Sequence, residues 1–428
     1  MSSTNRRSST TAGKKKSVTY APTEPSVEGG QIFTSVHTKS GTQSHSETAV
    51  DDVDNNLETD PEMHSVNRGT RLQRNALVVV TESEKGAEAA TCQYPGKKDQ
   101  DRYTVQLSPD TTVFPHYIGM FDGHGTSVFA AELCASQMLQ QVFGKDRAND
   151  DTPTPIPTDE AIVKAYRSLH DTVLDMVKKH PRTGTTAVTL FVGRESADSE
   201  VDTCKIAWAG DSRAAMISGD GKVTQLTMDH SISSNQNEMK RIAEADHTPR
   251  DGLLDSPGWA IEEQMAMERG TRARAGSFIG RREINGREAG PLVVFAHSGG
   301  VSLQVSRSIG DALAARSVLP DPEICTVQLP KDAYARFVVA SDGLWDVYST
   351  EAACRMVMDI PDPAVAARKL SLAARSKRTQ MGRTIDDITV IVFDVNSTHS
   401  RTSKTGSGIW ATSGSHRHSS SGEKCSIS

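Results

Sequence analysis

The sequence contains few aromatic residues and lacks any long hydrophobic run. Only 5% of its 428 residues are aromatic and 36% are hydrophobic, and the mean hydropathy is −0.45. No apolar run approaches the ~18 residues that cross a bilayer as a helix, and the N-terminal residues lack the apolar core of a secretory signal. We therefore expect neither a transmembrane helix nor secretion. For this length, the low hydrophobic content favours one large domain with polar tails.

The sequence also lacks paired cysteines and an excess of positive charge. Its six cysteines are scattered without a CxxC motif, at positions Cys92, Cys134, Cys204, Cys325, Cys354 and Cys425. This pattern predicts reduced thiols in a cytoplasmic protein, and it argues against a disulfide framework or a zinc site. The net charge of −6 and the pI of about 6.1 give no general attraction to nucleic acid, so we expect no nucleic-acid partner.

Polar segments flank the predicted domain. Residues 1–69 and 397–428 are dominated by Ser, Thr, Gly and charged residues, and we predict that both are disordered. The basic run Lys14-Lys15-Lys16 leaves a nuclear location open, although most short basic runs are merely solvated. The predicted folded domain therefore spans residues 70–396.

Hydrophobic periodicity predicts many short strands and several helices in this domain. Apolar runs predict strands at residues 76–80, 97–105, 117–121, 184–192, 205–209, 214–217, 222–226, 301–305, 337–341 and 388–393. Helical spacing predicts helices at residues 126–143, 162–177 and 238–245. Another helix is expected from Ser349 or Thr350, and a last one with Asp362 as its N-cap and Pro363 in its first turn. Asp220-Gly221, between the strands at 214–217 and 222–226, is typical of a hairpin turn. Residues 246–290 have no clear period, and we expect a long surface loop there. Because strands mostly come in hairpins and helices in pairs, the order favours an α+β fold with antiparallel sheets.

The stretch Phe121-Asp122-Gly123-His124-Gly125 is the first candidate site. It follows an apolar strand and precedes a helix, so Asp122 and His124 are expected on a tight turn, where α/β enzymes often hold reactive groups. Glycine at positions 123 and 125 lets the backbone approach a ligand closely. Taken alone, this stretch leaves open the alternative of an ordinary exposed turn.

Other apolar strands also begin or end at carboxylates. Asp342-Gly343 follows one strand, Asp386-Asp387 precedes another, and Asp101 and Asp211 lie beside two more. Five acidic sites at strand ends are costly unless positive charge lies among them. Oxygen ligands alone favour Mg²⁺ or Mn²⁺, and two such ions would activate a water for attack on a phosphoryl group. The alternative is that these residues only cap turns.

Eight motifs, in chain order, resemble those of the PPM-type (type 2C) metal-dependent protein serine/threonine phosphatases. They are Asp99-Gln100-Asp101, Phe121-Asp122-Gly123-His124-Gly125, Gly184-Thr185-Thr186-Ala187, Ala209-Gly210-Asp211-Ser212-Arg213, Leu226-Thr227-x-Asp229-His230, Val305-Ser306-Arg307-x-Ile309-Gly310-Asp311, Ala340-Ser341-Asp342-Gly343-Leu344-Trp345-Asp346 and Asp386-Asp387-Ile388-Thr389-Val390. The resemblance covers residues 71–396. It implies two packed antiparallel β-sheets flanked by helices, an αββα sandwich with two Mg²⁺ or Mn²⁺ ions at one end.

The resemblance also implies a ligand set. Asp122 would bridge both ions, the backbone carbonyl of Gly123 would bind one of them, and Asp342 and Asp386 would hold the other. Asp387 stands where many members have Asn, which makes it the weaker ligand candidate.

Three further roles are implied by the same resemblance. Asp101, with Gln100, would act in the outer shell through metal-bound waters, and Asp211 together with Asp342 matches the position of a third, looser ion. His124 would donate a proton to the leaving serine or threonine oxygen, a role that suits an imidazole near neutral pH.

The chain departs from the family pattern at the phosphate. Many members carry a phosphate-binding Arg five residues before the position of Asp101, where this chain has Gly96. Lys97 or Lys98 is the candidate substitute, as a point charge without the bidentate fork of Arg. The region 246–290 corresponds to a long flap, which we interpret mainly as a solvated insertion.

The last four residues, Cys425-Ser426-Ile427-Ser428, loosely match a prenylation motif. A single prenyl group on Cys425, without a strong basic patch, would attach the chain only weakly to a membrane. The alternative is a tail that happens to end near a cysteine.

These features lead to one function and two alternatives. We expect a monomeric Mg²⁺- or Mn²⁺-dependent phosphatase acting on phosphoserine and phosphothreonine in phosphoprotein substrates. A catalytically weak relative that binds phosphoproteins as a regulator is the first alternative, but such a relative should have lost Asp122, Asp342 or Asp386, and none is lost. The second alternative is a hydrolase of small phosphoesters.

Overall fold

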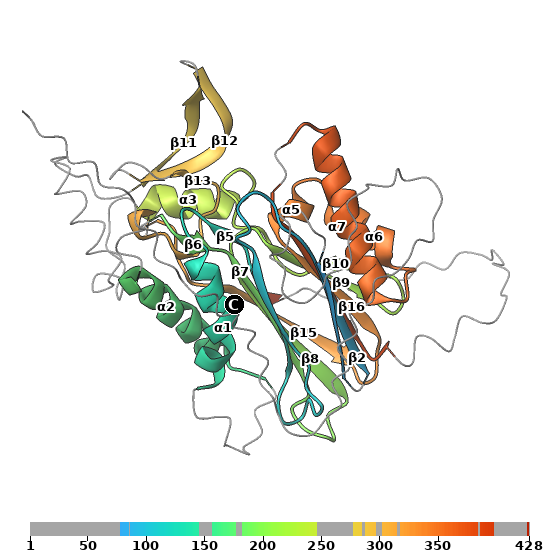
Figure 1. Cartoon of the computed structure of the whole chain (residues 1–428). Coiled ribbons are helices and arrows are strands. Elements are labelled where there is room, and N and C mark those ends of the chain that lie inside the picture. Colours follow the sequence, from blue (N-terminus) through green and yellow to red (C-terminus); the bar gives the residue numbers. More distant parts are fainter. Residues whose placement is uncertain are drawn as a thin grey trace, which may run out of the picture. The chain divides into compact units, whose positions relative to one another are not determined.

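Two six-stranded antiparallel sheets form the centre of the structure, a computed structural model that describes residues 78–84, 86–144, 156–176, 182–245, 277–284, 287–296, 302–314, 317–383, 386–397 and 426–427 (Figure 1). The strand order of the first sheet is β1 (Val78–Glu84), β2 (Ala87–Tyr94), β17 (Ile388–Val395), β16 (Ala335–Ala340), β9 (Arg213–Ser218), β10 (Val223–Gln225). The order of the second sheet is β18 (Ser426–Ile427), β15 (Glu323–Pro330), β8 (Val201–Ala209), β7 (Ala187–Gly193), β4 (His116–Phe121), β3 (Arg102–Gln106).

Two small sheets and the helices complete the described elements. The small sheets consist of β11 (Ser277–Ile284), β12 (Arg287–Ala296) and β13 (Ser302–Leu303), and of β14 (Ile309–Gly310), β6 (Gly184–Thr185) and β5 (Gly123–His124). The helices are α1 (Phe129–Phe143), α2 (Asp159–Met176), α3 (Gln236–Ala245), α5 (Asp342–Trp345), α6 (Thr350–Val357), α7 (Pro363–Gln380) and the 3₁₀ helix η2 (Ala312–Ala314).

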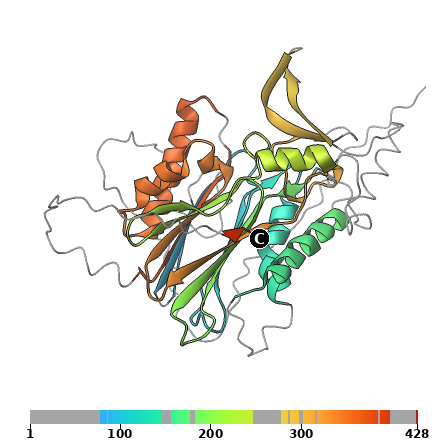
Figure 2. The same cartoon turned by 180° about the vertical axis from the view of Figure 1, so that it is seen from behind.

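The two large sheets pack face to face through residues that alternate along each strand. On β4, Ile118 lies in the core between the sheets, whereas Tyr117 packs with α1 and α2. On β17, Ile391 lies in the shared core and Val390 packs beneath α6 and α7. Because successive side chains of a strand point to opposite faces of the sheet, one strand contributes both to the core between the sheets and to the core beneath the outer helices. Figures 1 and 2 show α1 and α2 along one outer face and α6 and α7 along the other. This αββα sandwich confirms the predicted fold class.

Several local predictions are confirmed in detail. The Ser349 side chain accepts a hydrogen bond from the N–H of Ala352 at the start of α6, and Asp362 caps α7 in the same way, with Pro363 in its first turn. A capping oxygen satisfies an N–H that has no partner within the helix. The hairpin between β9 and β10 turns at Asp220-Gly221, with Gly221 at φ 84°. The helix predicted from residue 126 begins at Phe129 instead.

The prediction of one long surface loop at residues 246–290 is wrong for its last part. β11 and β12 form a hairpin over residues 277–296, which extends away from the sandwich (Figure 1). A register shift between Arg281 and Arg282 interrupts this hairpin. Its many arginines and glycines hid the strand pattern, because side chains on exposed strands need not alternate in polarity. Residues 246–276 lie outside the described residues.

Strands β2 and β15 were not predicted. The β2 sequence, Ala-Glu-Ala-Ala-Thr-Cys-Gln-Tyr, has no β-branched pattern, yet β2 pairs with β1 on one side and β17 on the other. Six of its eight residues are buried, namely Ala87, Ala89, Ala90, Thr91, Cys92 and Tyr94. Burial between two neighbours therefore overrides a weak local preference.

The C-terminal tail differs from its prediction at two residues. Ser426 and Ile427 form β18, in which Ile427 pairs with Cys325 of β15, whereas disorder was predicted throughout residues 397–428. Cys325 is disulfide-bonded, so the prediction of six reduced thiols is wrong for this residue, because spacing along the chain cannot show which segments meet at β15. Cys92, Cys134, Cys204 and Cys354 are free and buried. Cys425 and the first 69 residues lie outside the described residues.

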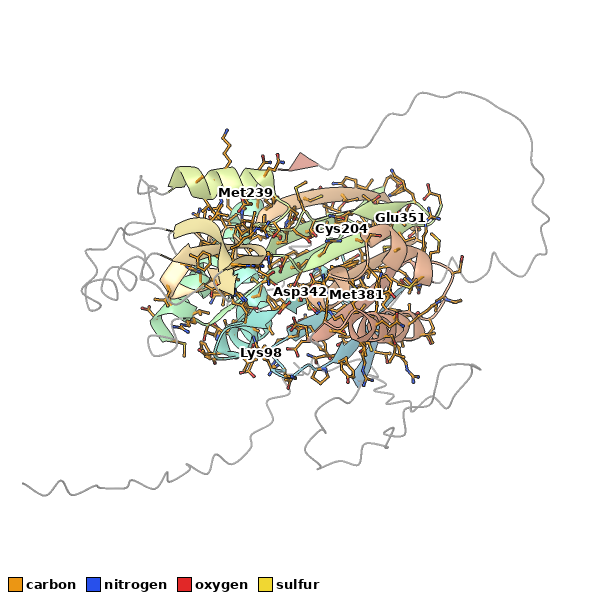
Figure 3. All side chains as sticks on the ribbon, turned by 90° about the horizontal axis from the view of Figure 1, so that it is seen from above. Lys98, Cys204, Met239, Asp342, Glu351 and Met381 are labelled. Atoms are coloured by element: carbon orange, nitrogen blue, oxygen red, sulfur yellow. The ribbon has the colours of Figure 1, made fainter. Side chains whose placement is uncertain are left out.

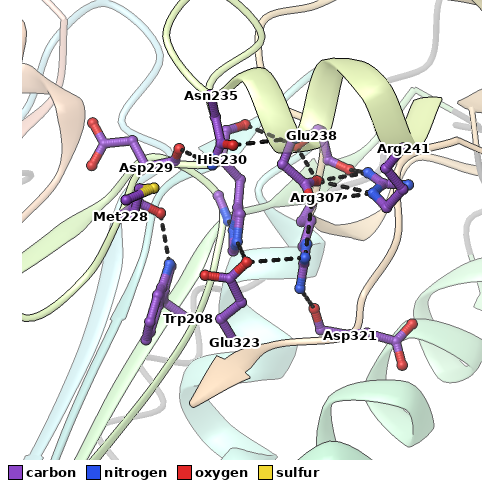
Figure 4. Close-up of polar contacts among 12 residues, drawn as sticks. Trp208, Met228, Asp229, His230, Asn235, Glu238, Arg241, Arg307, Asp321 and Glu323 are labelled. Atoms are coloured by element: carbon purple, nitrogen blue, oxygen red, sulfur yellow. Dashed lines mark hydrogen bonds and ion pairs between the residues drawn. The ribbon is translucent and has the colours of Figure 1, made fainter. Parts of the chain in front are cut away.

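A network of buried ions joins α3 to the loop before β14 and to β15 (Figure 4). The Glu238 carboxylate accepts hydrogen bonds from Arg241 Nη2 at 2.7 Å, Arg307 Nη2 at 2.9 Å and Ser306 Oγ at 2.5 Å. Arg307 also donates to Glu323 Oε1 at 3.1 Å. Burial alone would raise the pKa of Glu238, but the bonds and charges of the two arginines outweigh burial and hold this pKa well below its usual range.

We predict that Glu238→Gln lowers the free energy of unfolding at pH 7 by about 3 kcal/mol, because it leaves two buried guanidinium groups without their carboxylate. A carboxyl group whose pKa is depressed by folding stabilises the protein above its unfolded pKa, and this contribution is lost as the pH falls. The difference between variant and parent should therefore shrink below about pH 4.5. Urea denaturation at pH 7 and pH 4 measures both effects.

The matched control is Glu351→Gln. Glu351 is half exposed and pairs with Arg355 one turn away on α6, so its loss should cost less than about 0.5 kcal/mol. Equal losses from the two substitutions at pH 7 would show that the Glu238 network does not contribute specially to stability.

Candidate active site

The turn between β4 and β5 carries the first predicted site residues. Asp122 follows β4, and Gly123 and His124 form β5. The backbone carbonyl of Asp122 accepts a hydrogen bond from the N–H of Thr186 at 2.9 Å. A Cβ atom at Gly123 would lie 2.5 Å from the carbonyl oxygen of Gln100, in the segment before β3. The turn and this segment therefore approach too closely for a side chain at position 123. Neighbouring backbone thus fixes the turn on two sides.

Both large sheets contribute aspartates to this end of the sandwich. Asp101 and Asp122 flank β3 and β4 of the second sheet, whereas Asp211, Asp342 and Asp386 lie beside β9, β16 and β17 of the first. Burial, and then the charges of the other four, raise the pKa of Asp122 well above its ordinary value. Burial and nearby carboxylates also raise the pKa of Asp342, and they raise the pKa of Asp101 and of Asp211 to about 7. The structure therefore brings the five predicted aspartates together.

Several oxygen atoms here are buried without a hydrogen-bond partner in the described part of the chain. They are both carboxylate oxygens of Asp101, Gln100 Oε1 and Thr389 Oγ1. Unpaired buried oxygens are costly, and a hard cation such as Mg²⁺ or Mn²⁺ would satisfy them. Within the described ranges, no three acidic, histidine or cysteine side chains meet at the spacing of an assembled metal site. The donor chemistry of these oxygen ligands nevertheless fits such a cation.

His124 is paired with a buried carboxylate. Its Nε2 lies 2.6 Å from Oδ2 of Asp311, which is fully buried and also accepts a hydrogen bond from Ser308 Oγ at 2.5 Å. Burial lowers the pKa of His124, but the Asp311 carboxylate more than offsets this and raises it above its ordinary value. A Cβ at Gly184 would lie 2.2 Å from Asp311 Oδ2 and 2.6 Å from His124 Nε2, so a glycine is required beside this pair.

Asp387 holds the loop that carries Lys97 and Lys98. Its Oδ1 accepts a hydrogen bond from the N–H of Gly96 at 2.5 Å, and its Oδ2 accepts one from the N–H of Gln100 at 2.5 Å. Both lysines are exposed, and the charge of Lys98 acts on the pKa of His124, which places Lys98 near the turn. In the view from above, Asp342 lies near the centre and Lys98 toward one side (Figure 3).

Sequence reasoning missed three residues of this site. Asp311 belongs to a quoted motif, but nothing in the sequence showed that its φ of 57° would turn the carboxylate toward His124. Arg378 and Asp346 meet at 3.1 Å, although 32 positions separate them in the chain. A basic residue on a helix is usually solvated, so no feature of the sequence indicated that Arg378 would be buried.

A cavity of about 930 Å³ lies elsewhere, along α2. Its lining includes Asp159, Lys164, Arg167, Met176 and Ile324, and it contains none of the predicted site residues. It is open and carries charges of both signs. The candidate active site is therefore defined by its polar groups and not by this cavity.

Comparisons with known proteins agree with this geometry. The family model described as "Protein phosphatase 2C" matches residues 105–381. "Probable protein phosphatase 2C 5" of Arabidopsis thaliana is 27% identical over 303 residues, which cover 70% of this chain and 58% of the relative. "Probable protein phosphatase 2C 33" of Oryza sativa subsp. japonica is 29% identical over 318 residues, covering 72% of this chain and 61% of the relative. This chain thus spans about three fifths of the length of these plant relatives.

"Protein phosphatase 1L" of Bos taurus is 26% identical over 320 residues, covering 72% of each chain. Among solved structures, a serine-threonine phosphatase 2C from Toxoplasma gondii matches with a TM-score of 0.55 at 18% identity, covering 75% of this chain and 99% of that one. At that identity the structural match supports the fold. Because the family model covers well over half of the sequence, this chain belongs to the protein phosphatase 2C family.

Proposed function

We propose that this chain hydrolyses phosphoserine and phosphothreonine in proteins, with the help of Mg²⁺ or Mn²⁺. The observation that carries the proposal is the meeting of five aspartates from both sheets, with unpaired oxygens on buried Asp101, beside the His124–Asp311 pair. Membership of the protein phosphatase 2C family supports it.

The metal ligands in this proposal are those that the resemblance implied. Asp122 would bridge two ions, the Gly123 carbonyl would bind one of them, and Asp342 and Asp386 would bind the other. Asp101 would act through water, and Asp211 would contribute to a looser third site. When bound, the ions supply positive charge at the phosphoryl oxygens and lower the pKa of the attacking water.

Asp387 has a different role. Its two carboxylate oxygens already accept the N–H groups of Gly96 and Gln100. This agrees with its weaker candidacy as a ligand, because a carboxylate occupied by backbone donors binds a cation less readily. We infer that Asp387 positions the loop of residues 96–100 over the aspartates.

His124 would hold the proton that the leaving oxygen needs. The Asp311 carboxylate orients the imidazole through Nε2 at 2.6 Å, and Ser308 fixes that carboxylate in turn. A serine or threonine alkoxide is a poor leaving group, so protonation by a positioned acid contributes about 10²–10⁴-fold to such a reaction. Lys98, and less directly Lys97, would contribute positive charge at the phosphate.

We predict that Asp122→Asn abolishes Mn²⁺-dependent hydrolysis of a phosphothreonine peptide, a loss on the order of 10³-fold or more, because the shared ligand is removed. Release of phosphate with Mn²⁺ and with chelator measures this. The control is Asp220→Asn, in the exposed Asp-Gly turn between β9 and β10, which should leave turnover unchanged. If the parent protein binds the peptide but shows no Mn²⁺-dependent turnover, the chain is better described as a regulator that binds phosphoproteins. If it turns over small phosphoesters faster than the peptide, a small-phosphoester hydrolase is favoured.

We predict that His124→Gln lowers kcat on the phosphothreonine peptide by about 10²-fold but lowers kcat on p-nitrophenyl phosphate much less, because nitrophenolate leaves without a proton. Asp311→Asn should show the same dependence on the leaving group, with a smaller loss. Steady-state kinetics on the two substrates give the comparison. An equal loss on both would mean that His124 does not protonate the leaving group.

We predict that Lys98→Met raises KM for the phosphopeptide by about fivefold, with a smaller effect from Lys97→Met, because removing a charge near a dianionic phosphate weakens an exposed electrostatic contact by roughly 1 kcal/mol. Lys222→Met, in the hairpin between β9 and β10, is the control. If KM is unchanged in both loop variants, another group binds the phosphate.

Attachment to a membrane through Cys425, a cytoplasmic location and a monomeric state stay predictions. In the part of the chain that the structure describes, no helix is both long enough and apolar enough to cross a bilayer. The mass of the mature C-terminal peptide would show whether Cys425 carries a prenyl group.

A further inference from the structure

Arg378, in the last turn of α7, is buried directly behind the candidate metal site. Only 3% of its side chain is exposed. Its Nε donates a hydrogen bond to the carbonyl oxygen of Gly343 at 2.8 Å, and its Nη2 donates to the carbonyl oxygen of Asp342 at 2.9 Å. Nη2 also donates to Asp346 Oδ2 at 3.1 Å. The guanidinium is therefore fixed by α5, the short helix that begins at Asp342. A buried guanidinium needs such partners, because an unpaired buried charge is strongly unfavourable.

The same guanidinium approaches two of the proposed metal ligands without hydrogen-bonding to their carboxylates. Nη2 lies 4.0 Å from Asp342 Oδ1, and Nη1 lies 3.9 Å from Asp386 Oδ2. These distances exceed hydrogen-bond length but allow Coulombic attraction, which solvent screens more at Asp386, 58% exposed, than at Asp342, 29% exposed. Among the described residues, no other Lys or Arg nitrogen lies within 4 Å of the carboxylate oxygens of the five aspartates, although Arg102 donates to the backbone carbonyl of Asp101. Arg378 thus lends charge to this pair of ligands and leaves their oxygens available.

Two consequences follow from this position. A fixed positive charge reduces the repulsion between Asp342 and Asp386, which stabilises the folded protein when no divalent ion is bound. The same charge repels a divalent ion at these ligands, so it weakens ion binding. Both effects act through charge, and they should be separable from the hydrogen bonds to Gly343, Asp342 and Asp346.

We propose that Arg378 is a built-in counter-cation of the metal site, a positioning residue that stabilises the ion-free site and lowers its affinity for Mg²⁺ or Mn²⁺. The inference rests on the proposed function, because it takes Asp342 and Asp386 as metal ligands. It assigns to α7 a role in setting how readily the ions exchange.

The test uses two substitutions in the full chain. Arg378→Gln removes the charge but keeps an amide that can donate to the carbonyls of Asp342 and Gly343. Arg378→Lys keeps the charge but cannot reproduce the fork of Arg. Titration with Mn²⁺ alone, followed by the electron paramagnetic resonance signal of free Mn²⁺, gives the dissociation constant of each variant. Thermal unfolding with chelator and with saturating Mn²⁺ gives the accompanying change in stability.

We expect Arg378→Gln to bind Mn²⁺ about tenfold more tightly than the parent, and Arg378→Lys to bind within about twofold of it. Arg378→Gln should unfold at a lower temperature in chelator, and saturating Mn²⁺ should restore much of the difference. The control is Arg383→Gln, because Arg383 approaches the same Asp346 carboxylate at 3.3 Å but is 45% exposed. Its Mn²⁺ affinity should stay within about twofold of the parent.

Each other outcome overturns the inference. If the parent binds Mn²⁺ and Arg378→Gln binds it equally or more weakly, Arg378 is not a counter-cation, and the proposed function stands. If Arg378→Gln fails to fold even with saturating Mn²⁺, the role of Arg378 is that of its hydrogen bonds. If the parent itself shows no saturable Mn²⁺ binding, the proposed function fails, and this inference fails with it.

Discussion

Repulsion among carboxylates is the constraint on which the rest of the site depends. Asp122 lies among four other aspartates, and the strands that carry them come from both large sheets. Such a cluster opposes folding unless rigid elements hold it together. The αββα sandwich supplies them, because its strands are packed on both faces, between the two sheets and beneath the outer helices. The core therefore supports an arrangement that the site alone would not adopt.

Buried charged side chains elsewhere in the sandwich have oppositely charged partners. Arg336 is 1% exposed and pairs with Asp394 at 2.7 Å, and Glu238 is held by two arginines. Asp101 is equally buried, but its neighbours are the Asp387 and Asp122 carboxylates and the hydroxyls of Thr389 and Ser341, and no cationic side chain of the described residues pairs with its carboxylate. This buried carboxylate therefore lacks the counter-charge that Asp394 and Glu238 have. This contrast argues for a ligand-binding role more strongly than the number of aspartates does.

The features that the sequence predicted correctly are those that depend on residues close together in the chain. The strand before Asp122, the caps Ser349 and Asp362 and the Asp-Gly hairpin turn were all visible, because each depends on neighbours in the chain. The five aspartates were visible at the ends of apolar strands, and the resemblance supplied the role expected of each. The His124–Asp311 pair was not visible, because it joins residues 187 positions apart through a left-handed backbone at Asp311. Strand β2 was missed for a related reason, since its alanines are buried by tertiary packing and not by any β preference.

Gly96 and Asp387, two positions where this chain departs from the family pattern, contact each other directly. A Cβ at Gly96 would lie 2.7 Å from the carbonyl carbon of Asp386 and 2.8 Å from Asp387 Oδ1, so no side chain fits there. The space is taken because Asp387, where many members have Asn, accepts the N–H of Gly96 at 2.5 Å. A side chain at position 96 is therefore incompatible with the hydrogen bond between the Gly96 N–H and Asp387. In the function proposed above, the exposed lysines at positions 97 and 98 of this loop would supply positive charge at the phosphate in place of the arginine that many members have at position 96.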